Sequence, residues 1–329
     1  MVSATFISGN KKEQEWSLLT PLEWVVTGFD TRFLEGPERK TDSQIEELIE
    51  KNWENRQAER GRKGLFIEEP WPKTGYRGHD LDLAHRLMTV RISPADWKAM
   101  QGTHYNPEFY TLMLDRFNGR SRTKLPPENM HGDASFQAFI MPFLDGATAQ
   151  CAAVETNAGY PVGLRSDEVG VAPGMWHVPG GYLPGVGQGI YKTEVPVVNG
   201  RPIIGRKVFT PDTASMADNA RVNLFKESGS QINMAGAEVI YTGLIYEMPN
   251  HSVEFISIAR TDLERFGTNW EHMRGKMFHY VLNDIPSLLN DPGALPGGVL
   301  NAAEAALAVA YLRKKGLDSI GEFRRISKS

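Results

Sequence analysis

The sequence predicts an α/β (α+β) fold in which a mixed β-sheet is flanked by helices. Two observations support this. Apolar or alternating runs typical of strands recur along the chain, and helical patterns lie between them, including an Ala-rich stretch from about Asn301 to Lys315. The chain has 329 residues, enough for one large domain or two modest ones, and shows no internal repeat.

Composition limits the classes of protein to which the chain can belong. No apolar run approaches the roughly 18 residues needed to cross a bilayer, so no membrane partner is expected. The net charge of -4 argues against a general nucleic-acid binder and favours a small-molecule ligand. The N-terminus lacks a signal-peptide pattern and Cys151 is the only cysteine, so a cytoplasmic location is expected. Cys151 lies in an Ala-rich stretch, which favours a core position.

The first clear element is a helix. Ser43 and Glu46 are spaced as a capping box, and the apolar residues that follow lie on one helical face, so we expect a helix from Ser43 to about Arg60. Surplus apolar surface on this helix would allow a homodimer. The other elements predicted before residue 125 are strands at 64–67 and 87–92 and a short helix at 94–100 that begins at a Ser93 cap.

The chain is divided near residue 125. Residues 116–129 carry Gly, Ser, Arg and two prolines, a composition typical of a boundary. We therefore expect residues 1–125 to form an N-terminal region that packs on a core of residues 126–329. The elements predicted in this core are paired strands at 136–141 and 148–154, a short strand at 169–171, a strand at 176–178 that leads into a Gly-Gly turn, a helix from Asp212 to Gly229, and strands at 238–246 and 253–259.

A segment at about 182–211 is rich in Gly and Pro and interrupts the core. It contains Asn199-Gly200 between β-branched runs, which predicts a hairpin, with Pro202 favouring an edge position. The segment is therefore expected to be a structured flap.

Two motifs flank this segment. The tetrapeptide Val178-Pro179-Gly180-Gly181 precedes it, and the helix-like stretch RVNLFKESG, from Arg221 to Gly229, follows it. Together they resemble a Nudix box split by an insertion. The Nudix family places a Gly-Gly turn before a helix that reads Arg-Glu-apolar-any-Glu-Glu-any-Gly, and its carboxylates hold a divalent metal against a diphosphate. The resemblance implies a nucleoside diphosphate derivative as ligand.

The box is degenerate. Anchoring the pattern on Gly229 puts Val222 at the arginine position, Asn223 at the first glutamate, Lys226 at the second and Glu227 at the third. One of the three carboxylates is therefore retained.

The whole layout resembles the divergent UDP-glucose and UDP-galactose diphosphatases of animals. The matching features, over roughly residues 42–264, include Ile45, Trp53 and Arg56 on the first helix and Trp97 after the second. This resemblance implies a Nudix-type αβα sandwich with an N-terminal extension, and hydrolysis of a UDP-glucose type substrate to UMP and sugar 1-phosphate.

The chemistry of such a reaction requires a cation, because a diphosphate carries two negative charges beside the bond to be cut. Mg²⁺ neutralises such charge and lowers the pKa of bound water. Residues four apart share a helix face, so Asn223 and Glu227 are the expected metal ligands, with Glu254 as our first choice for a further acid. Glu227 and Glu254 are also the predicted catalytic residues. Lys226 would weaken metal binding through charge repulsion, or would itself hold phosphate.

Further residues are predicted to contact the substrate. Gly180 and Gly181 would let the backbone approach the ligand, and His177 precedes them closely enough to reach it. Arg77 could clamp a phosphate. Each has an ordinary structural alternative: His177 fits a half-buried strand, Glu254 an exposed strand position, and Arg77 the protein surface.

Three functional hypotheses follow. The first is a metal-assisted hydrolase of a nucleotide sugar. The second is a nucleotide-sugar binding protein that has lost catalysis, as Asn223 and Lys226 favour. The third is a Nudix-fold isomerase or cyclase that uses a residue such as His177 or Glu194 as acid or base.

Overall fold

The computed structural model describes most of the chain. The described residues are 4–7, 15–65, 67–166, 173–182, 191–194, 197–198, 201–202, 206–209, 224, 238–248, 252–265, 273–291, 294–323 and 326–328. Within these residues, no helix is long and apolar enough to cross a membrane.

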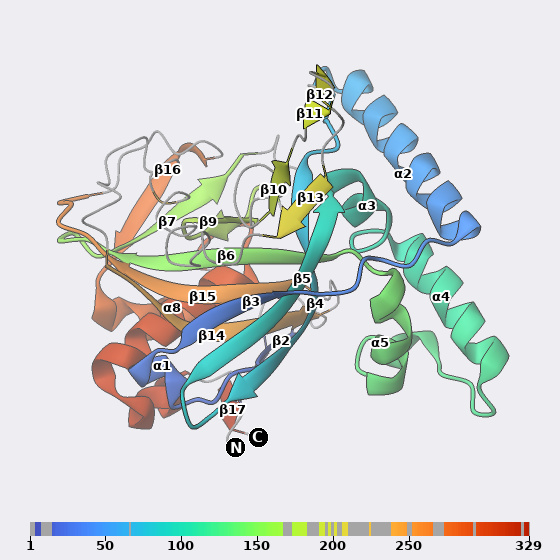
Figure 1. Cartoon of the computed structure of the whole chain (residues 1–329). Helices are drawn as coiled ribbons and strands as arrows, with labels where there is room; N and C mark the ends of the chain where they lie inside the picture. Colours follow the sequence, from blue (N-terminus) through green and yellow to red (C-terminus); the bar gives the residue numbers. More distant parts are fainter. Residues whose placement is uncertain are drawn as a thin grey trace.

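A curled, mixed sheet of ten strands forms the centre of the molecule (Figure 1). Its order is β17-β1-β2-β14-β15-β6-β4-β5-β3, with β9 paired to β6. Neighbouring strands are antiparallel except for the parallel pairs β15–β6 and β3–β5. The strands are β1 (Ala4–Ile7), β2 (Glu15–Leu18), β3 (Asp30–Glu35), β4 (Pro72–Asp82), β5 (Leu87–Asp96), β6 (Gly146–Glu155), β9 (Gly180–Tyr182), β14 (Glu238–Met248), β15 (Ser252–Arg260) and β17 (Ile326–Lys328).

Smaller sheets and the helices complete the described structure. A three-stranded sheet contains β16 (Met273–Tyr280), β7 (Tyr160–Arg165) and β8 (Trp176–His177), and two hairpins pair β10 (Tyr191–Glu194) with β13 (Arg206–Phe209) and β11 (Val197–Val198) with β12 (Arg201–Pro202). The helices are α1 (Trp24–Thr27), α2 (Ser43–Arg62), α3 (Trp97–Gly102), α4 (Pro107–Arg120), α5 (Ala134–Ile140), α7 (Ile285–Asn290) and α8 (Asn301–Lys315).

The two faces of the central strands bury different partners, because successive side chains of a strand point to opposite faces. Cys151, Ile245 and Ile256 lie on one face and pack in a core that includes α8. Phe255 and Leu244 lie on the other face, where the curled sheet brings β3 and β5 over them. The α/β (α+β) class is confirmed, and a mixed sheet between flanking layers is consistent with the predicted Nudix-type sandwich.

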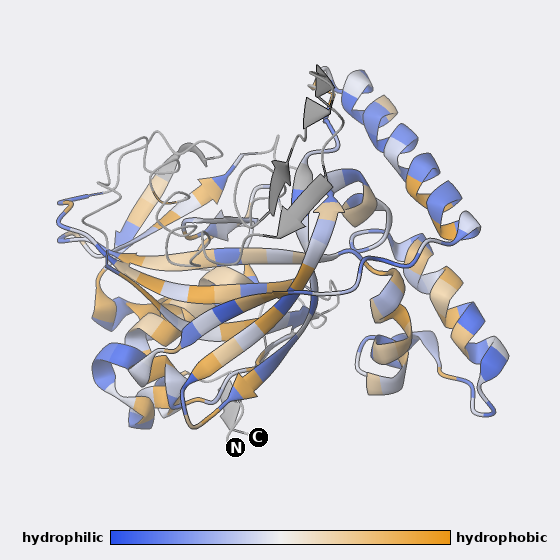
Figure 2. Cartoon of the chain, in the orientation of Figure 1, coloured by the Kyte–Doolittle hydropathy of each residue, from blue (hydrophilic) through white to orange (hydrophobic). Residues whose placement is uncertain are grey.

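Helix α8 matches its predicted bounds, Asn301 to Lys315. It ends before Gly316, whose φ of 93° suits a residue without a Cβ. From Asn301 to Leu312 all its residues but Glu304 are buried, so it is a core helix surrounded by protein (Figure 2).

Helices α2, α4 and α5 stand to one side of the sheet (Figure 1). Helix α2 confirms the first predicted helix, but its cap is Asp42, which accepts hydrogen bonds from the backbone amides of Gln44 and Ile45. The predicted capping box is wrong because Glu46 pairs with Arg39 at 2.7 Å instead of reaching back to Ser43.

Three other local predictions differ from the structure. Residues 136–141, predicted as a strand, lie mainly in α5, where an Asp133 cap and the buried pair Phe136 and Ile140 define a helical face. Residues 64–67 form no strand where described. The predicted helix at 94–100 is α3, which begins three residues later because Asp96 provides its cap while Ser93 lies within β5.

The other core strands follow the predictions closely. Strands β6, β14 and β15 contain the predicted strands, although β6 pairs with β15 and β4 rather than with residues 136–141. The β11–β12 hairpin across Asn199-Gly200 is confirmed. Residues 169–171, and the predicted helix at 212–229 apart from Leu224, lie outside the described residues.

Strands from both sides of residue 125 share the central sheet, since β4 pairs with β6 through Gly75 and Ala147. Backbone hydrogen bonds therefore join the two predicted parts. The division at residue 125 itself stays a prediction.

Candidate functional site

The VPGG segment forms a strand on the central sheet. Its last two residues, Gly180 and Gly181, belong to β9 and pair with Cys151 and Gln150 of β6. A Cβ added to Gly180 would lie 2.6 Å from the backbone oxygen of Gln150. Gly180 is therefore required for close contact with β6, and its predicted approach to a ligand stays a prediction.

Of the predicted box helix, the structure describes Leu224. Asn223, Lys226 and Glu227 lie outside the described residues, so their predicted roles stay predictions. Leu224 is 2% exposed and packs in a cluster with Ala152 and Ala259. In the register anchored on Gly229, Leu224 takes the apolar position of the motif, and its burial fits that register.

Glu254 lies on the sheet face opposite Leu224. Along β15, the side chains of Glu254 and Phe255 point to opposite faces of the sheet, and Glu254 is on the same face as Ala149, its neighbour on β6. Leu224 packs on the other face, with Ala259. The register therefore argues against a metal ion shared by Glu254 and the helix that would carry Glu227.

Glu254 instead belongs to a group of buried polar residues. Glu247 of β14 faces Ser252 of β15 directly, and Glu254 is the diagonal neighbour of Glu247 on the same face. The Glu247 carboxylate accepts hydrogen bonds from the Ser252 hydroxyl and from the backbone amide of Ala302 in the first turn of α8. Because a helix N-terminus favours negative charge, α8 stabilises ionised Glu247.

His104 extends this chain of hydrogen bonds. Its Nε2 lies 3.3 Å from Ser252 Oγ. The Ser252 hydroxyl donates its hydrogen to Glu247. The Ser252 oxygen therefore accepts a hydrogen bond from the Nε2–H of His104. The ring is then neutral, and Nδ1 is its unprotonated nitrogen. In the described part of the chain, this buried Nδ1 has no partner. Burial lowers the pKa of His104 to about 3, in keeping with a neutral ring.

Aromatic residues border the acid pair. The hydroxyls of Tyr105 and Tyr182 lie 2.6 Å apart, and the ring of Trp97 packs against both, with centroids at 5.9 and 5.4 Å. Tyr182 directly follows the Gly-Gly pair and is the β9 partner of Ala149. The residue after the Gly-Gly pair thus lies on the same face as Glu254.

Several of these residues are partly accessible to solvent. Glu254, Tyr105 and Tyr182 lie deep within the protein, yet each keeps solvent-accessible surface. Arg165 of β7 also keeps such surface, and its charge acts on both Glu254 and Tyr182. We call the group formed by Glu254, Tyr105, Tyr182 and Arg165 the acid recess.

The acid pair has unusual protonation. Burial raises the pKa of Glu247 to about 7. Burial and repulsion by Glu247 raise the pKa of Glu254 well above its ordinary value, against the opposing charge of Arg165. The pair therefore retains a proton near neutral pH, so it can both donate and accept hydrogen bonds.

His177 lies near this region but is buried, at 8% exposure. Its β8 neighbour Trp176 exchanges backbone hydrogen bonds with Gly298 and Leu300, just before α8. Burial and the charge of Arg165 lower the pKa of His177 well below its ordinary value, so the ring is neutral. His177 is thus a buried residue of the core, three residues before Gly180.

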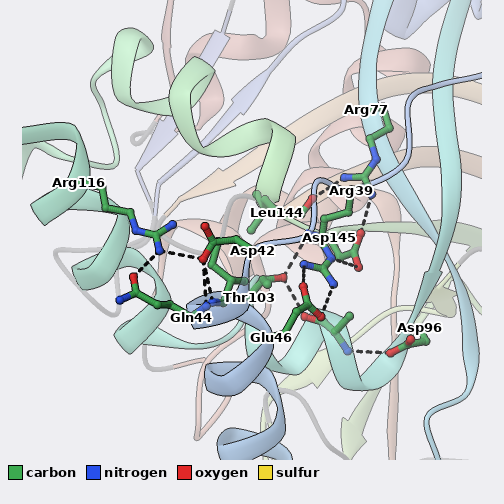
Figure 3. Close-up of polar contacts among 12 residues, drawn as sticks. Arg39, Asp42, Gln44, Glu46, Arg77, Asp96, Thr103, Arg116, Leu144 and Asp145 are labelled. Carbon is green, nitrogen blue, oxygen red and sulfur yellow. Dashed lines mark hydrogen bonds and ion pairs between the residues drawn. The ribbon is translucent and has the colours of Figure 1, made fainter. Parts of the chain in front are cut away.

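Arg77 has a structural role. Its guanidinium donates to Ser93 Oγ and Asp145 Oδ1, both at 2.6 Å, and to the backbone oxygen of Leu144 (Figure 3). Its side chain is 3% exposed. Asp145 and the two other acceptors hold Arg77 in the core, and its predicted role as a phosphate clamp stays a prediction.

The donor set of the described residues gives little support for Mg²⁺. Within that part of the chain, no group of three or more His, Cys, Asp or Glu side chains could hold a metal ion. Glu254 of the acid recess and the adjoining Glu247 contribute two carboxyls, and Arg165 opposes a cation there. Metal ligation by Asn223 and Glu227 stays a prediction.

Sequence reasoning missed several members of this site: Glu247, Ser252, His104, Tyr105, Tyr182 and Arg165. One signal was available, since Tyr182 directly follows the Gly-Gly pair. Glu247 and Glu254 also flank a short connection between two predicted strands, at positions that hairpin pairing places on one face.

Comparisons with known proteins add a fold likeness. No family model matches the chain, and no curated protein matches it. Among solved structures, the chain is similar to the MutT protein from Methanosarcina mazei Go1, with 11% identity, coverage of 52% of this chain and 95% of that chain, and a TM-score of 0.31. A TM-score at this level carries no argument about function.

Proposed function

We propose that the protein is a Nudix-like hydrolase that cleaves a nucleoside diphosphate joined to a sugar, with UDP-glucose as the type substrate. One observation carries the proposal. The strand that holds Gly180 and Gly181 continues into Tyr182, which belongs to the acid recess with Glu254. A diphosphate next to the Gly-Gly pair would therefore place its attached group beside these partly accessible polar side chains.

The burial of Leu224 adds support. It agrees with the register that places Glu227 at the third glutamate of the box. The proposed reaction is attack of water on one phosphorus, with cleavage of the bond to the bridging oxygen and release of UMP and sugar 1-phosphate. The proposed ligands Asn223 and Glu227 supply a single negative charge next to Lys226, which is a poor set for Mg²⁺.

The test is a product assay. The protein is incubated with UDP-glucose or UDP-galactose and Mg²⁺, Mn²⁺ or EDTA, and UMP release is followed. We expect turnover that Glu227→Gln lowers at least about tenfold, as loss of one catalytic acid commonly does. Glu238→Gln, which changes an exposed β14 acid, should leave it unchanged. Absence of UMP with every substrate and metal would overturn the proposal.

A second function is favoured by one feature. The proton held by the Glu247 and Glu254 pair near neutral pH supplies an acid without a metal, as a nucleotide-sugar isomerase or cyclase would require. In that case, NMR of the reaction mixture would show a rearranged sugar and no UMP. A pure binding protein would leave the substrate intact while still raising its own melting temperature with UDP-glucose.

A further inference from the structure

The acid recess and its neighbours hold hydrogen-bonding capacity that the described residues leave unused. In the described part of the chain, the Glu254 carboxyl has no hydrogen-bond partner. Two further buried atoms close to the Glu247 site also have none there: His104 Nδ1 and Asn301 Oδ1. His104 is joined to Glu247 through Ser252, and Asn301 directly precedes the Ala302 amide that binds Glu247. Buried polar groups are normally paired with protein or ordered water, and Glu254, which keeps accessible surface, can take a partner from outside the chain.

The charges of the recess select the kind of partner. Two carboxyls disfavour an anionic group such as the diphosphate itself. A strongly cationic group is also disfavoured, because Arg165 acts on Glu254 from one side and Lys73 Nζ lies 5.2 Å from the Tyr182 ring centroid on another. A neutral group with several hydrogen-bond donors and acceptors fits best.

The aromatic side chains of the recess add a second preference for the kind of ligand. Tyr105 and Tyr182 present ring surfaces and hydroxyls next to a carboxyl. Sugars have apolar C–H faces that pack on aromatic rings and hydroxyl edges that bind carboxyls. Pockets for small ligands generally combine aromatic walls with a few polar groups in this way.

We infer that the acid recess binds the sugar group of the substrate, with the Glu254 carboxyl hydrogen-bonded to its hydroxyls. This inference rests on the proposed function, because it places the diphosphate beside Gly180 and Gly181. Glu254 is then a specificity residue on the α8 side of the sheet, rather than a metal ligand on the box-helix side. Its role is to distinguish a nucleotide sugar from the nucleotide alone.

Calorimetric titration tests this on the full chain. UDP-glucose, UDP and glucose 1-phosphate are titrated in EDTA, so that hydrolysis does not consume the ligand. We expect the wild type to bind UDP-glucose at least about tenfold more tightly than UDP, since hydrogen bonds to a charged or shared-proton carboxyl are strong. Glu254→Ala should bring this ratio close to one and leave the affinity for UDP unchanged.

Matched variants distinguish a loss of sugar binding from misfolding. Glu254→Gln keeps the side-chain shape and should reduce the ratio by less than Glu254→Ala. Tyr105→Phe should reduce it partially through loss of one hydroxyl. Glu238→Ala alters an exposed acid on β14 and should leave the ratio unchanged. Melting curves of all variants confirm that each is folded.

The outcomes separate the two proposals. Equal affinities of the wild type for UDP and UDP-glucose would overturn the sugar site while leaving hydrolysis, measured by UMP release, in place. Equal weakening of UDP and UDP-glucose by Glu254→Ala would assign the recess to the nucleotide instead. If no UDP compound binds or is cleaved, the proposed function fails. Binding of glucose 1-phosphate that Glu254→Ala abolishes would then still support the recess, and absence of that binding would overturn it too.

Discussion

Glu247 and Glu254 occupy diagonal positions on antiparallel strands and lie on the same face of the sheet. Both are deep in the protein. Glu247 has hydrogen bonds to Ser252 and Ala302, and the charge of Arg165 acts on Glu254. Like charges at this spacing disfavour double ionisation. The two residues therefore behave as one acid that keeps a proton at neutral pH.

The first prediction concerns stability and pH. The pKa of Glu247 is raised from 4.5 to about 7 in the folded protein. Below pH 4.5 both the folded and the unfolded state hold the proton; between pH 4.5 and 7 only the folded state does, so its stability falls as pH rises through this window. Glutamine does not titrate, so Glu247→Gln should gain up to about 3 kcal/mol relative to the wild type between pH 4.5 and 8, at about 1.4 kcal/mol per pKa unit.

Urea unfolding at several pH values from 4.5 to 8 provides the measurement. Glu238→Gln is the control, because that acid is exposed. Parallel stability curves for Glu247→Gln and the wild type would show that Glu247 titrates normally.

The second prediction concerns the ion pairs that hold the helices to the sheet. Asp145 lies between Arg77, at 2.6 Å, and Arg39, at 3.2 Å, and is almost fully buried (Figure 3). Asp145→Asn leaves the buried Arg77 without its counter-charge and leaves Arg39 paired with Glu46 alone. We expect a loss of about 3–5 kcal/mol in the free energy of unfolding, measured by urea titration. Asp80→Asn breaks an exposed pair with Arg91 and should cost less than about 1 kcal/mol. Equal effects would refute the structural role of Asp145.

The third prediction concerns Gly180. An alanine there would place its Cβ 2.6 Å from the Gln150 oxygen, so β9 must shift away from β6. We expect Gly180→Ala to cost about 1–3 kcal/mol of stability and to lower UDP-glucose binding, because Tyr182 moves with the strand. Gly61→Ala, at an open position in α2, should stabilise the protein by about 0.5–1 kcal/mol. Thermal melts compare the two, and an unchanged melting temperature for Gly180→Ala would contradict this geometry.

The fourth prediction concerns the register of the predicted box. Leu224 is 2% exposed among Ala152 and Ala259. Leu224→Ala should cost about 2–5 kcal/mol in urea unfolding, as for other buried leucines. Val26→Ala, at a 38% exposed position, serves as the reference for an aliphatic truncation near the surface. A loss no greater than that of the reference would argue that the helix does not pack on β6 and β15.

The helices and hairpins that depend on residues close together in the chain were predicted well from the sequence. Helix α8 has its predicted bounds because an Ala-rich run with a following glycine specifies a helix in almost any surroundings. The Asn199-Gly200 hairpin is likewise encoded by its turn residues. Burial of Cys151 followed from its apolar neighbours.

Predictions failed where a distant partner decided the outcome. Residues 134–140 are short and apolar enough for strand or helix, and packing against α4 and the Asp133 cap decided for helix. The cap of α2 is Asp42 because Arg39 holds Glu46. The pairing of Arg77 with Asp145, which is 68 residues away in the sequence, was likewise beyond local pattern.

The sequence by itself determined strands β5, β6, β14 and β15, the terminal helix, and the presence of a Gly-Gly segment before a helix-like motif, since each depends on residues close together in the chain. Only the tertiary structure decided what surrounds Glu254. Curling of the sheet and docking of α8 bring Glu247, Ser252 and His104 together, although His104 and Ser252 are 148 residues apart. Burial and charge at this site arise from contacts between distant segments, and these depend on strand register and helix packing rather than on local propensity.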